Sequence, residues 1–172
     1  WSGSASMPKD EFWSKAISAV KEKFPEFIFI AEAYWDMEWE LQQMGFDFTY
    51  DKKFYDRLCR SSADEVRAHL WASLDYQSKS IRFIENHDEP RSIVEMDRGR
   101  TEAAAVIAYT VPGLKLVFDG QMEGKRIKIP VQLGVEPLEA IDNRIYSFYK
   151  MFMEFVNDDI FCFGEWKMLN VQ

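Results

Sequence analysis

The stretch FIFIAEAYW, residues 27–35, places five consecutive apolar residues ahead of a carboxylate, Glu32. An apolar run of this kind is typical of a strand that is buried on both faces, as in a parallel sheet. An ionised side chain is costly inside such a strand. We therefore expect Glu32 to lie at the carboxyl end of the strand, where it is available for function.

Further strands are expected over 46–51, 80–85 and 114–119, each followed by a helical or loop segment. The strands begin at intervals of roughly 20 to 34 residues, near the about 30 residues of one unit of a (β/α) barrel. Alternating strands and helices predict a parallel sheet and an α/β fold. Periodicity alone favours a small open doubly wound sheet, because 172 residues cannot close an eight-stranded barrel.

The helical segments carry recognisable start and stop signals. Ser6 and Pro8 open an amphipathic pattern that ends at Pro25. A capping box, Ser62 with Glu65, opens another. A long helix is expected over 137–156 and a strand of different character over 164–171. The residues expected to face the core are Phe12, Ala16, Ala19, Val20 and Phe24 in the first helix and Val66, Leu70 and Leu74 in the second.

Composition narrows the class of ligand. The chain is 47% hydrophobic and 16% aromatic, which predicts a folded protein, and its net charge of -8 argues against nucleic-acid binding. Acidity with many aromatic residues is compatible with sugar binding. No signal-peptide pattern or membrane-span pattern occurs, so we expect no membrane partner. Cys59 and Cys162 have no metal-site spacing and are expected to be reduced thiols.

Polar residues that core packing would not select follow the expected strands. They are Glu32, then Asp47 and Asp51, then ENHDEPR over 85–91, then Asp119 to Gln121. Glu32 and Asp88 each close a strong apolar run, and two facing carboxylates are what glycoside hydrolysis requires. Glu32 suits the acid role, because Ile30, Tyr34 and Trp35 would hydrate its charged form poorly. The alternative is a salt-bridged carboxylate at a strand end.

The other polar residues of this region allow several readings. His87 could donate to a sugar hydroxyl, ligate a metal or satisfy a backbone carbonyl. It can share a site with Asp88 only if the strand has already ended, since adjacent strand residues point to opposite sides. Arg91 could pair with a catalytic carboxylate or lie on the surface. His69 is expected on the surface or in helix packing.

Four segments resemble the α-amylase family of glycoside hydrolases, in the family's order. FIFIAEAYW resembles its fifth-strand motif, and IRFIENHDEPR (81–91) resembles its seventh-strand motif. VPGLKLVFDGQMEGKR (111–126) is similar to the eighth-strand segment, and DFTYDKKFYDRL (47–58) fits the region of strand six. The resemblance implies that residues 1–163 form strands five to eight, with their helices, of a (β/α)8 TIM barrel. Residues 164–172 would begin a β-rich C-terminal domain.

The resemblance also implies residue roles. Glu32 would be the general acid/base, and Asp88 would stabilise the oxocarbenium-like transition state. Substrate would be bound by His87, Tyr34 and Trp35, and the supporting residues would be Asn86, Arg91 and Gln121. The substrate would be an α-glucan or maltooligosaccharide, and no cofactor or metal is expected in this chain. Glu85 and Asp119 depart from the commoner family pattern, which leaves the choice of substrate open.

One family element is missing from the sequence. The nucleophile of the family is an Asp two residues after an Arg, and no Arg-x-Asp occurs in these 172 residues. We therefore expect the parent enzyme to be a retaining hydrolase or transglycosylase, and this chain to be inactive alone. It should form a homo-oligomer or pair with the missing half of the barrel. The alternatives are a non-catalytic half-barrel that at most binds sugar, and an unrelated parallel α/β enzyme whose motif matches are accidents.

Overall fold

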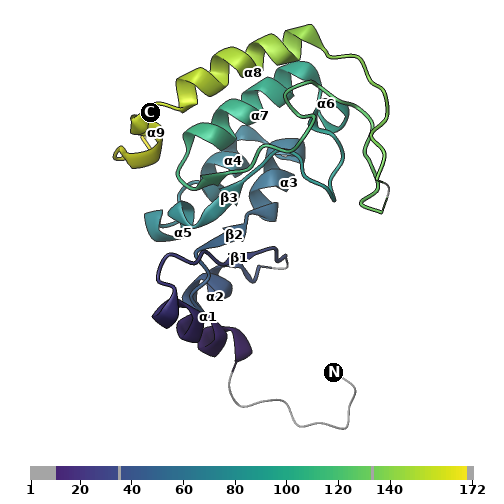
Figure 1. Cartoon of the computed structure of the whole chain (residues 1–172). Helices are drawn as coiled ribbons and strands as arrows, with labels where there is room; N and C mark the ends of the chain where they lie inside the picture. Colours follow the sequence, from purple (N-terminus) through teal and green to yellow (C-terminus); the bar gives the residue numbers. More distant parts are fainter. Residues whose placement is uncertain (1–10, 35, 133, 170–172) are drawn as a thin grey trace. The chain divides into compact units, whose positions relative to one another are not determined.

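The computed structural model describes residues 11–34, 36–132 and 134–169. The chain divides between Tyr50 and Asp51 into two compact units, here called the N-terminal unit and the C-terminal unit, and each is described by itself. Figure 1 labels the elements of both. Both units combine helices with short strands that pair in parallel, so the predicted α/β class with parallel strand pairing is confirmed.

The N-terminal unit contains α1 (Phe12–Lys23), β1 (Ile30–Ala31), α2 (Glu38–Gln43) and β2 (Phe48–Tyr50). The two strands pair in parallel, with Ile30 opposite Phe48 and Ala31 opposite Thr49. A small apolar cluster joins the elements, and its buried members are Ile17, Ala31, Leu41 and Phe46. This unit carries Glu32 directly after β1.

The predicted core face of α1 is wrong. Its buried residue is Ile17, whereas Phe12 is 69% and Phe24 is 62% exposed. Trp13 lies four residues before Ile17 on the same helix face, and its ring centroid is 5.4 Å from that of Phe46. Apolar residues occur on two sides of this helix, so spacing alone could not select the packed side. Ser6 and Pro8, the predicted start signals, lie outside the described residues.

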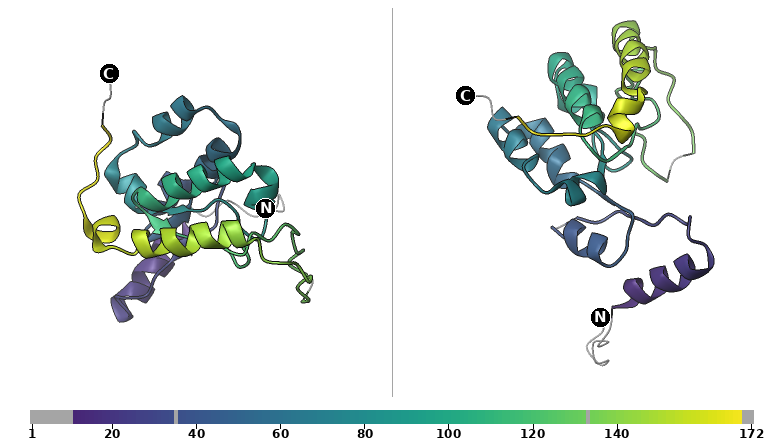
Figure 2. Two further views of the ribbon diagram at one scale, coloured as in Figure 1. Left: turned by 90° about the horizontal axis from the view of Figure 1, so that it is seen from above. Right: turned by 90° about the vertical axis from the view of Figure 1, so that its left-hand side faces the viewer.

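The C-terminal unit contains the remaining elements (Figure 1). They are α3 (Lys52–Arg60), α4 (Ala63–His69), α5 (Leu74–Ser78), β3 (Ser80–Arg82), α6 (Ser92–Glu95), α7 (Arg98–Thr110), β4 (Leu114–Lys115), α8 (Asn143–Val156) and α9 (Asp159–Phe163). β3 pairs in parallel with β4, with Ile81 opposite Leu114. α7 and α8 lie side by side, and the ring centroids of Tyr109 and Phe152 are 6.5 Å apart between them (Figure 2).

The predicted capping box at the start of α4 is confirmed. Ser62 N donates to Glu65 Oε2 at 3.0 Å, and Glu65 N donates to Ser62 Oγ at 3.4 Å. Val66 and Leu70 are buried as predicted, but Leu74 is 53% exposed. The predicted helix ends early because Ser73 caps a new helix, α5, which turns Leu74 away from the core.

The C-terminal segment also differs from expectation. The helix predicted over 137–156 begins only at Asn143, where Asp142 Oδ1 accepts from Arg144 N at 3.0 Å and caps it. α9 was not predicted. Residues 164–169 form no strand, and the rest of the strand predicted over 164–171 lies outside the described residues. Among the described helices, none is long and apolar enough to cross a membrane.

A buried polar network secures β3 within the C-terminal unit. Arg82 in β3 is fully buried and donates to the carboxylate of Asp51, to Gln77 Oε1 and to Pro112 O. His69 Nε2 lies 2.8 Å from Asp51 Oδ2, and His69 Nδ1 accepts from Arg57. Since a carboxylate only accepts and an arginine only donates, the proton of this ring lies on Nε2. The network joins α3, α4, α5 and β3.

Candidate active site

Residues 85–91 form a turn beyond β3. The strand ends at Arg82, so His87 and Asp88 lie in a loop, which is the condition under which they can share a site. Asn86 Oδ1 accepts from Asp88 N at 2.9 Å and from Glu89 N at 2.8 Å. Asn86 is 2% exposed. Its buried side chain therefore shapes the backbone that presents His87 and Asp88.

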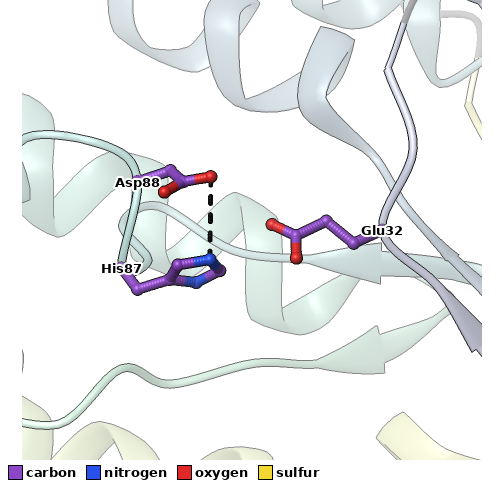
Figure 3. A group of neighbouring side chains, drawn as sticks. All are labelled: Glu32, His87 and Asp88. Carbon is purple, nitrogen blue, oxygen red and sulfur yellow. Dashed lines mark ion pairs between the residues drawn. The ribbon is translucent and has the colours of Figure 1, made fainter. Parts of the chain in front are cut away.

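His87 and Asp88 are the accessible polar pair of this turn. Their side chains are 37% and 53% exposed, and His87 Nε2 lies 3.6 Å from Asp88 Oδ2 (Figure 3). That separation is longer than a hydrogen bond, so the carboxylate keeps accepting capacity. A partly exposed imidazole can contact sugar hydroxyls, and an exposed carboxylate can contact a developing positive charge.

Arg91 closes the turn from its far side. Its NH1 donates to Glu85 Oε1 at 2.9 Å, and Glu85 Oε2 accepts from Ser92 N at 2.6 Å and Ser92 Oγ at 2.7 Å. Arg91 is 5% exposed and Glu85 is 1% exposed. The alternative that Arg91 lies on the surface is therefore wrong. Its carboxylate partner is the buried Glu85.

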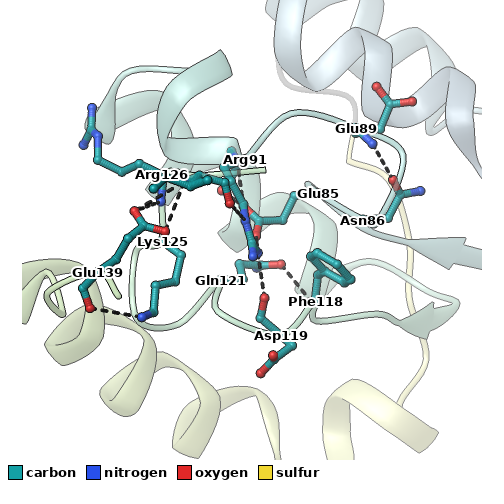
Figure 4. Close-up of polar contacts among 12 residues, drawn as sticks. Glu85, Asn86, Glu89, Arg91, Phe118, Asp119, Gln121, Lys125, Arg126 and Glu139 are labelled. Atoms are coloured by element: carbon teal, nitrogen blue, oxygen red, sulfur yellow. Dashed lines mark hydrogen bonds and ion pairs between the residues drawn. The ribbon is translucent and has the colours of Figure 1, made fainter. Parts of the chain in front are cut away.

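Arg91 also reaches the segment after β4. Its NH1 donates to Asp119 O at 2.6 Å, and its Nε donates to Ile127 O at 3.2 Å (Figure 4). The guanidinium carbon lies 4.9 Å above the centre of the Phe118 ring. Lys128 Nζ donates to Asp88 O. The turn and the segment 118–128 are thus tied together by side chains.

Gln121 anchors the segment after β4 from the interior. Its Nε2 donates to Tyr109 OH at 2.8 Å and Tyr149 OH at 2.9 Å, and Phe118 N donates to its Oε1 at 3.3 Å. Burial raises the pKa of the Tyr109 hydroxyl well above its ordinary value. Gln121 is 2% exposed, so in this structure it supports the loop from within. Its neighbour Gly120 has a φ of +82°, a backbone conformation that favours glycine.

Glu32 lies in the N-terminal unit, at the predicted end of its strand. It follows β1 directly, is exposed, and accepts from Tyr34 OH at 3.1 Å. Ala31 is buried, but Ile30 is 49% exposed, so the strand is not buried on both faces as predicted. The apolar cluster of this unit covers the Ala31 side. Trp35, which was predicted to bind substrate together with Tyr34 and His87, lies outside the described residues.

Asp47 and Asp51, the carboxylates predicted at the end of the second strand, have structural partners. Asp47 precedes β2, contrary to the predicted position at the end of that strand, and binds Lys21 and Phe29 N. Burial alone would raise the pKa of Asp47, but these two contacts hold it below its ordinary value. Asp51 belongs to the Arg82 network. Burial opposes its ionisation too, and the His69 hydrogen bond and the Arg82 charge lower its pKa overall.

Sequence reasoning missed His69, Arg82 and Glu85 as buried polar residues. His69 was expected on the surface or in helix packing, yet it is 8% exposed and bonded to Asp51. A signal was present for Arg82, since a charged residue inside the apolar run SIRFIE needs a buried partner. Cys59 and Cys162 are free thiols as predicted. Burial raises the pKa of the Cys59 thiol to about 11.

Comparisons with known proteins agree with the motifs. No protein-family model matches the chain. An α-amylase, MalA, of Haloarcula japonica is 30% identical over 125 residues, which are 67% of this chain and 18% of that protein. A noncanonic maltogenic α-amylase of Thermotoga neapolitana superposes with a TM-score of 0.71 at 24% identity, covering 94% of this chain and 40% of that one.

A third relative shows the same fold. The ligand-free cyclic α-maltosyl-(1→6)-maltose hydrolase of Arthrobacter globiformis gives a TM-score of 0.74 at 19% identity, over 87% of this chain and 38% of that one. The chain spans less than half the length of each of these three relatives. In fold and in sequence it is similar to part of the α-amylase family of glycoside hydrolases, and the resemblance predicted from its motifs is confirmed.

Proposed function

We propose that this chain is part of a glycoside hydrolase or transglycosylase that cleaves α-glucosidic bonds with retention of configuration. The observation that carries the proposal is the turn after β3, where Asp88 is exposed and His87 partly exposed while Glu85, Asn86 and Arg91 are buried. The names of these proteins, two α-amylases and a cyclic α-maltosyl-(1→6)-maltose hydrolase, support an α-glucan or maltooligosaccharide as substrate. Residues 1–163 would form strands five to eight of the barrel.

The roles follow from the chemistry of the side chains. Glu32 protonates the glycosidic oxygen as the bond to the anomeric carbon breaks, and then, as a carboxylate, takes a proton from the incoming water. The Tyr34 hydroxyl, which donates to Glu32 Oε1, orients that carboxyl group. Asp88 stabilises the positive charge that develops on the sugar ring. His87 and the aromatic residues Tyr34 and Trp35 bind the sugar, and Asn86, Arg91 and Gln121 hold the loops.

The nucleophile has to come from outside this sequence. A retaining enzyme forms a covalent glycosyl intermediate, and the family's Arg-x-Asp motif is absent from the 172 residues. We propose that these residues alone do not turn over α-glucans, and that they act with a segment that supplies the nucleophile. The absence of that motif is also the one observation that favours the alternative, a half-barrel that associates with another copy and at most binds sugar.

Glu32→Gln in the intact protein that contains this chain tests the acid/base role. Hydrolysis of maltooligosaccharide should fall by about 10²- to 10⁴-fold, because the amide cannot protonate the leaving oxygen. An aryl α-glucoside with a good leaving group needs less protonation, so its first step should be slowed much less. Steady-state and burst kinetics on both substrates measure the difference.

Glu26→Gln, an exposed carboxylate of the same unit, is the matched control and should leave both rates unchanged. Equal and small losses on both substrates in Glu32→Gln would exclude Glu32 as the acid. An intact protein with no activity on any α-glucoside would favour the non-catalytic alternative.

A further inference from the structure

We propose that Glu85 is a positioning residue for Asp88, acting through its buried pair with Arg91. The inference rests on the proposed role of Asp88 in the reaction. Neither the sequence nor the resemblance gave Glu85 a role in the reaction. Its position is unusual, because it lies three residues before Asp88 in the chain and bonds to residues that come after it.

Both carboxylate oxygens of Glu85 are used, and by different residues. Oε1 accepts from Arg91 NH1, while Oε2 accepts from the backbone and the hydroxyl of Ser92. These three bonds close the base of the turn that carries residues 86–90. Within that closed turn, Asn86 Oδ1 receives the amides of Asp88 and Glu89. Closing the base therefore fixes the direction in which the Asp88 side chain leaves the turn.

Arg91 also connects the turn to the segment after β4. The guanidinium that binds Glu85 also donates to the carbonyl oxygens of Asp119 and Ile127. From the other side, Lys128 donates to the carbonyl oxygen of Asp88 itself. Asp88 is thus positioned relative to residues 119–128 by one buried cation and one exposed cation (Figure 4 shows the Arg91 contacts). A planar guanidinium presents its N–H donors in a rigid arrangement, so one side chain fixes these three acceptors relative to one another better than a flexible lysine would.

A purely stabilising role explains this arrangement less well. A buried ion pair is weak evidence for stability, since apolar residues of the same volume often serve as well. Apolar residues could not receive Ser92 N or bind the two carbonyl oxygens. The hydrogen bonds that need these charged groups are the ones to backbone atoms, and those backbone segments lie beside the polar side chains of the turn.

The test is Glu85→Gln in the intact protein. Glutamine keeps one acceptor oxygen but places an NH2 group against Arg91 or Ser92, both of which donate. We expect kcat on maltooligosaccharide to fall by about 10- to 100-fold with KM within about threefold, as for a catalytic group displaced by about 1 Å. Hydrogen exchange at the Asp88 and Glu89 amides should become faster. Arg91→Lys should likewise lower kcat and speed amide exchange, because lysine keeps the positive charge but lacks the rigid set of guanidinium donors.

Glu102→Gln is the matched control, because it breaks an exposed Glu–Arg pair on α7 and should change neither readout. If Glu85→Gln does not fold, Ser92→Ala removes only the hydroxyl donor and should give a smaller change in the same direction. Unchanged amide exchange in the 86–92 region of a folded variant overturns the inference. So does a lower melting temperature with unchanged kcat.

The two proposals fail in different ways. If the intact protein and its Asp88→Asn variant have equal rates on α-glucosides, the proposed function is wrong. Amide exchange still decides whether Glu85 orders the turn, since that measurement needs no substrate. If Asp88→Asn is inactive but Glu85→Gln has full activity, the function stands and the positioning role is wrong.

Discussion

The C-terminal unit contains two buried carboxylate–arginine pairs with the same chemistry and different surroundings. Asp51 and Arg82 are both fully buried, and their further partners, His69 and Gln77, are buried too. Glu85 and Arg91 are also buried, but their pair closes a turn in which His87 is partly exposed and Asp88 is exposed. The first pair connects helices to a strand, and the second connects loops and the start of α6. Burial of a charged pair therefore does not by itself distinguish a structural element from a support for chemistry; the neighbours of the pair do.

Removal of the first pair should give the largest loss of stability. Asp51→Ala leaves Arg82 charged in the interior, and we expect the free energy of unfolding to fall by about 3–5 kcal/mol. Urea unfolding of the intact protein, followed by circular dichroism, measures this. Asp56→Ala, which breaks exposed pairs on the neighbouring α3, is the control and should cost no more than about 1 kcal/mol. A loss for Asp51→Ala as small as that of the control would show that the Asp51–Arg82 pair is not needed for the stability of the fold.

Disturbing the second pair through the backbone should have a smaller effect. Gly120 has a positive φ, and an added Cβ would lie 2.7 Å from Lys125 Cγ and 3.2 Å from Arg91 NH2. Gly120→Ala should cost about 1–2 kcal/mol for the left-handed conformation. Gly99→Ala in α7 is the control, because its added Cβ has no contact shorter than 3.4 Å and alanine favours helix. Thermal melting of both variants distinguishes them, and equal melting temperatures would contradict the strain at Gly120.

The smallest expected effect is a loss of stability at low pH. The pKa of Asp51 lies below its ordinary value of 3.8 in the folded protein, so its ionised form is the one that folding favours. This contribution is fully present above the unfolded value and is lost as the pH falls through the folded one. The melting temperature should therefore decline below about pH 4, and more steeply in the wild type than in Asp51→Asn, which has no carboxylate to protonate. Parallel profiles for the two proteins would show that Asp51 contributes nothing to acid sensitivity.

Features set by neighbouring residues could be predicted from the sequence. The partners that residues find in the folded chain could not. The capping box at Ser62 and the position of Glu32 at a strand end depend on neighbouring residues, and both are found. The packed face of α1 depends on which surfaces meet, and the partner of Arg91 depends on how the turn over 85–91 closes. Two apolar faces on one helix, or several carboxylates near one arginine, are equivalent until the chain has folded.

The roles in the candidate site came from a resemblance, since spacing left them open. The order of four motifs identified the family, and the comparisons confirm the resemblance. The resemblance could not assign a role to Glu85, because this residue departs from the commoner family motif. Its partners, Arg91 and Ser92, could not be selected from the sequence either. Only the folded turn shows that its two oxygens serve Arg91 and Ser92.

The most direct test of the central claim is Asp88→Asn in the intact protein, with specific activity on maltooligosaccharide measured on samples whose melting temperature is also recorded. The amide has the same volume, and Asp88 is exposed with no buried partner charge among the described residues. We expect turnover to fall by at least about 10³-fold, because the neutral side chain cannot stabilise the developing charge, while the melting temperature changes little. A large fall in melting temperature with retained specific activity would contradict the account and make Asp88 a structural residue like Asp51.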